Sequence, residues 1–310
     1  YLGTDNGILV YNYRTDKYEQ PDTDFPTDVR TMVLQGDTLW IGSLNGLYIY
    51  QLKSRQLNHF DSKQTGLPHN TIYSIIHTKD NQIYIGTYNG LCRYVQASGK
   101  FENILLPVNR GGSNLFVNSL LEDTARQCIW IGMEGYLFQY NPTTGEMKAI
   151  EVFHNNSIKS LALDGDENLL AGTDNGLYVY QNDKEPLQHI IHDSRNIKSL
   201  TNNIIWNIFS DQEHNIWLGT DYGISLSRYN SALQFVPISQ ITGTGDGNQF
   251  YSLFRDSKGF YWFGGTNGVI RFTHPAGNKH DAIWYRMGDK KHPLSHNRIR
   301  HIYEDREQQL

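Results

Sequence analysis

The first twelve residues, Tyr1–Asn12, read YLGTDNGILVYN, and the five residues GTDNG occur a second time at Gly172–Gly176. The copy at Gly172 reads LLAGTDNGLYVY. Five further segments share its frame of an apolar pair, a glycine, a short polar turn and an alternating run: LWIGSLNGLYIY, IYIGTYNGLCRY, IWIGMEGYLFQY, IWLGTDYGISLSRY and YWFGGTNGVIRF. The chain therefore contains seven copies of one motif, and this repeat is the feature to interpret first.

The spacing of the copies indicates the architecture. The first glycines of the copies lie 39 to 47 residues apart, at Gly3, Gly42, Gly86, Gly132, Gly172, Gly219 and Gly264. This is the length of one four-stranded propeller blade. Pairs such as Asn89 and Gly90 predict two-residue hairpin turns in which both central positions have a positive φ. We therefore expect an all-β, seven-bladed β-propeller of four-stranded antiparallel blades.

The two ends of the chain complete one another. The last segment, SHNRIRHIYEDREQQL, matches the inner strand and the Asp turn of a repeat but stops before the glycine motif, with which the chain begins. We expect the N- and C-terminal strands to pair in one closing blade, which removes exposed sheet edges. Residues 1–310 then form a single propeller domain, and the start inside a hairpin indicates a piece of a longer protein.

Composition excludes some classes of protein. The net charge is -5, with acidic and basic residues mixed along the chain, so there is no basic excess for binding nucleic acid. No apolar run approaches the ~18 residues that span a membrane. Cys92 and Cys128 lack the spacing of metal ligands, and we expect both to be small buried residues.

The repeats resemble two-component regulator propeller repeats. Residues 200–230, LTNNIIWNIFSDQEHNIWLGTDYGISLSRYN, follow the pattern N-x-V-x-x-I-x-x-D-x-x-G-x-L-W-I-G-T-x-x-G-L-x-x-Y almost position for position. The resemblance implies a periplasmic sensor propeller of a hybrid two-component system of the Bacteroidetes type, non-enzymatic in this piece. It also implies an oligosaccharide ligand, a second propeller and an immunoglobulin-like domain in the same longer chain, homodimerisation, and a histidine kinase that regulates glycan utilisation.

One position of the repeat varies while its framework stays constant. It follows the first apolar residue of each inner strand and holds Arg30, Tyr73, Asn118, Lys159, Trp206, Tyr251 and Arg300. Inner strands line the central channel of a propeller, so these cations, aromatic rings and amide could form a ring that binds an acidic oligosaccharide. The commoner alternative is packing between blades or a solvated rim. The loops SKQTGLPHN, NRGGSNLF and HDSRNIKSLTNN could equally carry the contacts.

Other polar groups are better explained by structure than by chemistry. The segment ITGTGDGNQF lacks the strand-to-helix context of a phosphate-binding loop. His189 and His192 could share a metal with Asp193, but their spacing on a strand points them to opposite faces. Asp28 and His301 could meet as an acid–base pair, with ordinary hydrogen bonding as the default. The recurring aspartates are expected to be turn formers: Asp80, Asp123, Asp164, Asp211, Asp256 and Asp305.

Two other functions stay open at this point. A propeller lyase of the streptogramin-lyase kind would need a metal-binding carboxylate and a channel histidine, and only Asp28 and His301 come near that requirement. A protein-docking scaffold would bind through its rim, which leaves no distinctive spacing. We expect no catalytic residue, no metal site and no cofactor.

Overall fold

The computed structural model describes residues 1–21, 23–108, 115–150, 156–181, 188–230, 233–239, 248–273, 282–291 and 293–305. In these residues the strands form seven sheets of four strands each, and helical structure is limited to the short α1 (Ser62–Thr65) and to residues 238–239. Contacts divide the chain into two compact units, one of residues 1–5, 9–21 and 159–310 and one of residues 6–8 and 22–158. The predicted all-β fold, a seven-bladed β-propeller of four-stranded antiparallel blades, is confirmed.

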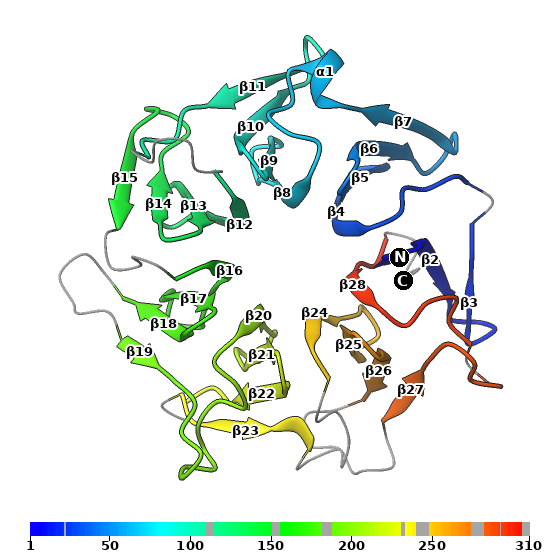
Figure 1. The fold of residues 1–310 in the computed structure, drawn as a ribbon, viewed down its shortest axis with the longest axis vertical. Coiled ribbons are helices and arrows are strands. Elements are labelled where there is room, and N and C mark those ends of the chain that lie inside the picture. Colours follow the sequence, from blue (N-terminus) through cyan, green and yellow to red (C-terminus); the bar gives the residue numbers. More distant parts are fainter. Residues whose placement is uncertain are drawn as a thin grey trace. The chain divides into compact units, whose positions relative to one another are not determined.

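The first unit contains the sheet that joins the chain ends and three sheets of consecutive strands (Figure 1). In order across each sheet, the strands are β28 (Ile299–Ile302), β1 (Leu2–Thr4), β2 (Gly7–Asn12) and β3 (Lys17–Glu19); β16 (Ile158–Leu163), β17 (Leu169–Thr173), β18 (Gly176–Tyr180) and β19 (Gln188–Ile190); β20 (Ile205–Ser210), β21 (Ile216–Thr220), β22 (Gly223–Ser227) and β23 (Phe235–Pro237); and β24 (Phe250–Arg255), β25 (Tyr261–Gly265), β26 (Gly268–Phe272) and β27 (Ile283–Tyr285).

The second unit contains three sheets of consecutive strands. They are β4 (Val29–Gln35), β5 (Thr38–Ser43), β6 (Gly46–Gln51) and β7 (Gln56–Phe60); β8 (Ile72–His77), β9 (Ile83–Thr87), β10 (Gly90–Val95) and β11 (Lys100–Ile104); and β12 (Val117–Asp123), β13 (Cys128–Met133), β14 (Leu137–Tyr140) and β15 (Met147–Ile150).

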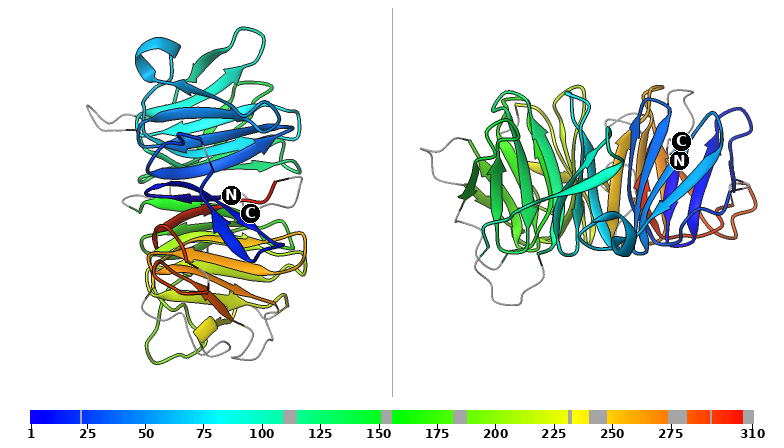
Figure 2. Two further views of the ribbon diagram at one scale, coloured as in Figure 1. Left: turned by 90° about the vertical axis from the view of Figure 1, so that its right-hand side faces the viewer. Right: turned by 90° about the horizontal axis from the view of Figure 1, so that it is seen from above.

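One sheet of the first unit joins the two ends of the chain. Strand β28 pairs antiparallel with β1, and Leu2 lies opposite Ile302. Beyond this pair the Tyr303 N–H donates to the Tyr1 carbonyl oxygen at 2.8 Å. Figures 1 and 2 show red strand β28 beside the dark-blue N-terminal strands. The predicted pairing of the N- and C-terminal strands is confirmed.

The hairpins of the motif differ in one detail from the prediction. The two turn residues are Tyr88 and Asn89, and Gly90 follows them, paired with Thr87 and with a φ of +118°. The Thr87 hydroxyl accepts the Asn89 N–H at 3.1 Å and donates to the Gly90 carbonyl oxygen at 2.9 Å. Tyr88 and Asn89 are both described, and neither has a positive φ. The predicted positive φ at both central positions is therefore wrong, because the threonine closes the turn and only the glycine is left-handed.

The first glycine of the motif serves the packing of neighbouring sheets rather than a turn. A Cβ atom added to Gly172 would lie 2.7 Å from Cγ2 of Ile205 on the next sheet, and one added to Gly264 would lie 2.7 Å from Cγ2 of Ile299. Side-chain atoms in packed cores do not approach this closely, so a residue larger than glycine would push the sheets apart. The same close approach is made by Val117 at Gly86 and by Phe250 at Gly219, so the repeat keeps a glycine where the next sheet comes this near.

The core of each unit lies between neighbouring sheets. Trp217 and Trp262 are fully buried, and each packs its ring against the following sheet. The ring centroids of Trp217 and Phe263 lie 5.4 Å apart, and those of Trp262 and Tyr11 lie 5.0 Å apart. In the second unit Trp130 is likewise fully buried. Because the middle strands are covered on both faces, they read as continuous apolar runs rather than as alternating ones.

Candidate functional site

The variable residues of the inner strands occupy β-bulges. In the β20–β21 pair the register shifts between Ile205 and Asn207, so Trp206 is the extra residue of a bulge. A bulge changes the direction in which the side chain of its extra residue points. The strict alternation of side chains along the strand, on which the alternative of packing between blades rested, therefore does not hold at Trp206. The same shift surrounds Arg30, Tyr73, Asn118, Tyr251 and Arg300. All of these residues, and Lys159 at the equivalent position, are half-buried, and each follows a fully buried apolar residue.

Four of these side chains form a continuous line in the first unit, which we call the inner row. The Lys159 Nζ lies 4.5 Å from the Trp206 ring centroid, and the rings of Trp206 and Tyr251 meet edge to face at 5.4 Å. The guanidinium carbon of Arg300 lies 4.6 Å from the Tyr251 ring centroid. Each cation–π contact of this kind contributes roughly 0.5–1 kcal/mol. The inner row is thus two half-buried aromatic rings between two cations.

Hydrogen bonds fix the two rings of the inner row. The Trp206 Nε1 donates to Oδ1 of Asp221, a residue of the β21–β22 turn, at 3.0 Å. The Gln249 Nε2 donates to the same oxygen at 2.7 Å, and the Tyr251 hydroxyl donates to Gln249 Oε1 at 2.5 Å. A network of this kind holds side chains in one arrangement before a ligand arrives, which lowers the entropy that binding costs.

A second turn carboxylate compensates the charge at the other end of the inner row. Asp5 accepts from Arg300 Nε at 3.0 Å and from Arg298 Nη1 at 3.2 Å. Burial raises the pKa of Asp5, and the hydrogen bonds and charges of Arg300 and Arg298 lower it by more, so this pKa lies below its ordinary value. Asp5 thus compensates part of the positive charge that Arg300 and Arg298 bring to this end of the inner row.

The other three predicted site residues lie in the second unit. The Tyr73 ring lies 6.0 Å from the Phe116 ring. Burial raises the pKa of Tyr73 above its ordinary value, although the nearby charge of Arg30 opposes the shift. The Asn118 Nδ2 donates to Ser157 Oγ at 3.2 Å. The role of these three residues as ligand contacts stays a prediction.

Sequence reasoning missed the turn residues that hold the inner row. Asp5 and Asp221 each contact the bulge residue of their own sheet. A signal was present, because this turn position also varies from copy to copy within a constant framework. Its occupants are Asp5, Leu44, Tyr88, Glu134, Asp174, Asp221 and Thr266.

A cleft of about 350 Å³ lies along the loop HDSRNIKSLTNN, one of the loops predicted to carry contacts. Its lining includes His192, Asn196, Ile197 and Tyr222. The Ile197 and Tyr222 side chains are 77% and 55% exposed, and Tyr222 directly follows the Asp221 that holds the Trp206 indole. The predicted role of this loop in ligand contacts stays a prediction.

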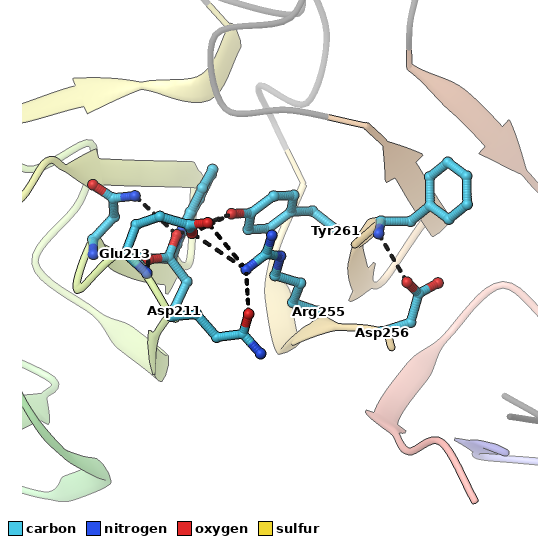
Figure 3. Close-up of polar contacts among 9 residues, drawn as sticks. Asp211, Glu213, Arg255, Asp256 and Tyr261 are labelled. Atoms are coloured by element: carbon cyan, nitrogen blue, oxygen red, sulfur yellow. Dashed lines mark hydrogen bonds and ion pairs between the residues drawn. The ribbon is translucent and has the colours of Figure 1, made fainter. Parts of the chain in front are cut away.

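The recurring aspartates hold turns and also join neighbouring sheets. Asp211 Oδ1 accepts the Glu213 N–H at 3.0 Å, while Oδ2 accepts from Trp217 Nε1 of its own sheet at 2.8 Å and from the Tyr261 hydroxyl of the next sheet at 3.0 Å. Figure 3 shows this arrangement, in which Arg255 also pairs with Glu213. Backbone N–H groups of the turn donate likewise to Asp123, Asp164 and Asp256. The predicted turn role is confirmed for these four residues and stays a prediction for Asp305.

Two copies hold this turn with a different side chain. In the β8–β9 turn the Thr78 hydroxyl, not Asp80, accepts the Gln82 N–H at 3.0 Å, and Asp80 in turn accepts from Thr78. The predicted turn role of Asp80 is corrected accordingly, because Thr78 occupies the position that aspartate takes elsewhere. In the β4–β5 turn Gln35 accepts the Trp40 indole at 3.1 Å.

The histidines of HIIHD have structural partners. The His189 ring stacks on Tyr178 with centroids 4.1 Å apart and contacts the Asn175 carbonyl oxygen. The His192 ring contacts the Leu200 carbonyl oxygen. Across the described ranges no group of three or more His, Cys, Asp or Glu side chains could hold a metal ion.

The other sequence candidates have simple outcomes. Cys92 and Cys128 are free and buried, as predicted. Asp28 lies in the second unit and His301 in the first, so an acid–base pair between them stays a prediction. Parts of two predicted segments, residues 109–114 of NRGGSNLF and 241–247 of ITGTGDGNQF, lie outside the described residues. Within the described part of the chain, no helix has the length and apolarity to cross a membrane.

Comparison with known proteins shows which repeats and proteins this chain is similar to. Residues 66–89, 199–222 and 244–267 match the two component regulator propeller family. The solved extracellular domain of the hybrid two component system BT4673 from B. thetaiotaomicron is 82% identical, with a TM-score of 0.72 over 99% of this chain and 41% of that one. The curated histidine kinase P4 of Formosa agariphila is 27% identical over 88% of this chain and 21% of its own length. The chain thus spans less than half of either relative.

A more distant likeness concerns the fold alone. Virginiamycin B lyase from Staphylococcus aureus has a TM-score of 0.63 over 92% of this chain and 88% of that one, at 12% identity. A likeness at this identity carries no argument about activity. The three matched segments bear out the predicted resemblance to two component regulator propeller repeats.

Proposed function

We propose that this chain is a ligand-sensing propeller of an extracytoplasmic two-component sensor, and that it binds an oligosaccharide at the inner row without chemically changing it. The half-buried, hydrogen-bonded pair of Trp206 and Tyr251 carries the proposal. Aromatic faces suit the apolar faces of sugar rings, and fixed polar groups at their edges suit hydroxyls. Lys159 and Gln249 provide donors beside the rings, and Asp221 provides an acceptor.

The relatives support the sensor part of this proposal. Both are longer than this chain, and one is the extracellular domain of a hybrid two component system. We place this chain in the periplasm, in a longer sensor with a second propeller, an immunoglobulin-like domain and a histidine kinase. Dimerisation of that sensor would carry the signal that regulates glycan utilisation.

Calorimetric titration tests the proposed ligand. The chain is titrated with a panel of neutral and uronate-containing oligosaccharides, and the Trp206→Ala variant is titrated beside it. Trp284→Ala is the matched control, because Trp284 is also half-buried and also makes a cation–π contact but lies outside the inner row. The Arg286 guanidinium carbon lies 3.7 Å from its ring centroid. We expect Trp206→Ala to weaken binding by about tenfold or more, since stacking on one ring contributes about 1.5 kcal/mol. Equal affinity of both variants overturns the inner row as the site, and turnover of any panel member overturns the non-enzymatic function.

A further inference from the structure

The carboxylate of Asp221 uses its two oxygens differently. Oδ1 accepts both structural donors, from Trp206 Nε1 at 3.0 Å and from Gln249 Nε2 at 2.7 Å. Oδ2 accepts from no donor in the described part of the chain, and it is not one of the buried side-chain atoms that lack a partner there. Asp221 is half-buried, so Oδ2 is the part of its carboxylate that reaches solvent beside the Trp206 indole.

The carboxylate at the same turn position of the closing sheet has no such open oxygen. Asp5 accepts from Arg300 Nε through Oδ1 and from Arg298 Nη1 through Oδ2. Both of its oxygens therefore already have guanidinium partners. Asp221, by contrast, holds two side chains of the site with one oxygen and leaves the other available to a ligand.

A hydrogen-bond donor lies next to the open oxygen. Two contacts orient the Gln249 side-chain amide, since Oε1 accepts the Tyr251 hydroxyl at 2.5 Å while Nε2 donates to Asp221. Nε2 carries two hydrogens, and Asp221 accepts one of them. Because Oδ1 and Oδ2 belong to one carboxylate, the other Gln249 hydrogen and the open Asp221 oxygen lie close enough together to meet adjacent groups of one ligand.

This donor and this acceptor select the ligand group that fits them. Of two adjacent hydroxyls on a sugar ring, one can donate to Asp221 Oδ2 and the other can accept from Gln249 Nε2, while the apolar face of the ring lies on the aromatic side chains. A uronate carboxylate has acceptors alone and would meet the Asp221 charge. An ammonium group has donors alone and would leave the amide hydrogen unpaired. Two adjacent hydroxyls on a neutral sugar residue match both groups.

We propose that Asp221 and Gln249 bind a vicinal diol of a neutral sugar residue at the inner row, and that Asp221 determines specificity there. This inference rests on the proposed function, because it names the part of the oligosaccharide that the inner row recognises. Residues whose hydroxyls are alkylated are disfavoured, since an ether oxygen cannot donate to Oδ2.

Calorimetric titration with matched ligands tests this assignment. The probes are the neutral oligosaccharides of the panel and their O-methylated forms, in which each hydroxyl has lost its hydrogen. Both forms are titrated into the native chain and into Asp221→Asn. In this variant the Trp206 and Gln249 donors keep the amide oxygen at the place of Oδ1, so an NH2 group replaces Oδ2. Asp166→Asn, which changes an exposed carboxylate in the β16–β17 turn, is the control.

The expected result is a change in preference between the two ligand forms. The native chain and Asp166→Asn should bind the free-hydroxyl form about tenfold or more tightly than the O-methylated form. In Asp221→Asn this preference should be about tenfold or more smaller, because its NH2 group donates to an ether oxygen as well as to a hydroxyl. Other effects of methylation are common to both proteins and cancel in the comparison. A merely structural role of Asp221 would weaken both ligand forms equally and leave the preference unchanged.

The outcomes separate this proposal from the proposed function. If Trp206→Ala weakens binding while Asp221→Asn keeps the native preference, the inner row stands and the diol assignment is overturned. If the native chain binds both ligand forms equally, the assignment is overturned whether or not Asp221→Asn folds. If Trp206→Ala binds the oligosaccharides as the native chain does, the inner row and the diol assignment are both overturned.

Discussion

The guanidinium of Arg300, on the C-terminal strand β28, donates through Nε to Oδ1 of Asp5, in the turn after the N-terminal strand β1, at 3.0 Å. The contact reinforces the backbone pairing of the two chain ends and holds the Arg300 side chain 4.6 Å from the Tyr251 ring centroid. One ion pair therefore serves both the closure of the sheet and the inner row.

The Arg300–Asp5 pair should make stability depend on pH. The folded-state pKa of Asp5 lies below its unfolded value, so the contribution of the pair is present above the unfolded pKa and is lost as pH falls through the folded pKa. We expect Asp5→Asn to lower the free energy of unfolding by about 1 kcal/mol at neutral pH. Urea unfolding of both proteins across the acid range checks this. The two curves should converge at low pH, and a constant gap would contradict the role of the charge.

The close approach of neighbouring sheets at Gly172 should be sensitive to a single methyl group. Gly172→Ala places a Cβ 2.7 Å from Cγ2 of Ile205, and overpacking of this kind costs about 1–3 kcal/mol. Ile205→Ala is the partner change, because it removes the Cγ2 methyl that meets the new Cβ. A double-mutant cycle of Gly172→Ala with Ile205→Ala should show a coupling energy of about 1 kcal/mol or more. Ile205→Val is the control: it shortens the side chain but keeps a Cγ2 methyl, so its coupling to Gly172→Ala should be weak. Additive effects in both pairs would mean that the contact is not the cause.

The carboxylate of Asp211 should contribute more to stability than an exposed carboxylate of the same kind of turn. Asp211→Asn turns an acceptor of the Trp217 indole and the Tyr261 hydroxyl into a donor. Leaving two buried donors without an acceptor costs about 1–3 kcal/mol. Asp166→Asn, in the exposed part of the neighbouring turn, is the control and should change stability by less than about 0.5 kcal/mol. Chemical denaturation of both variants measures the difference, and equal effects would refute the linking role of Asp211.

The two thiols should be unreactive in the native protein. Cys92 and Cys128 are 0% and 3% exposed, and burial raises the pKa of both thiols. Because the thiolate is the reactive form, Ellman's reagent should modify neither cysteine until denaturant is added. Rapid reaction of either thiol at neutral pH without denaturant would show that its sheet opens readily.

The fold could be predicted because its rules are local and are repeated. The period of the glycine motif gave the number of blades, and the unmatched ends gave the closing sheet. The two roles of glycine could not be separated in the same way. Gly90 is required by its own backbone φ of +118°, whereas Gly172 is required by Ile205 on a neighbouring sheet. Only a structure shows a contact with a distant residue.

The site could be predicted in part for the same reason. Comparison of copies singled out Trp206, Tyr251 and Arg300 as candidates, because a variable residue stands out against a constant framework. It did not show that each lies in a β-bulge, since a register shift leaves no mark in the sequence.

A crystal structure with a bound oligosaccharide from the titration panel tests the central claim most directly. We predict a sugar ring in contact with the Trp206 and Tyr251 side chains, with hydroxyls near Lys159 and Asp221. A bound ligand that touches neither ring, in a crystal where the inner row is open to solvent, would contradict the claim.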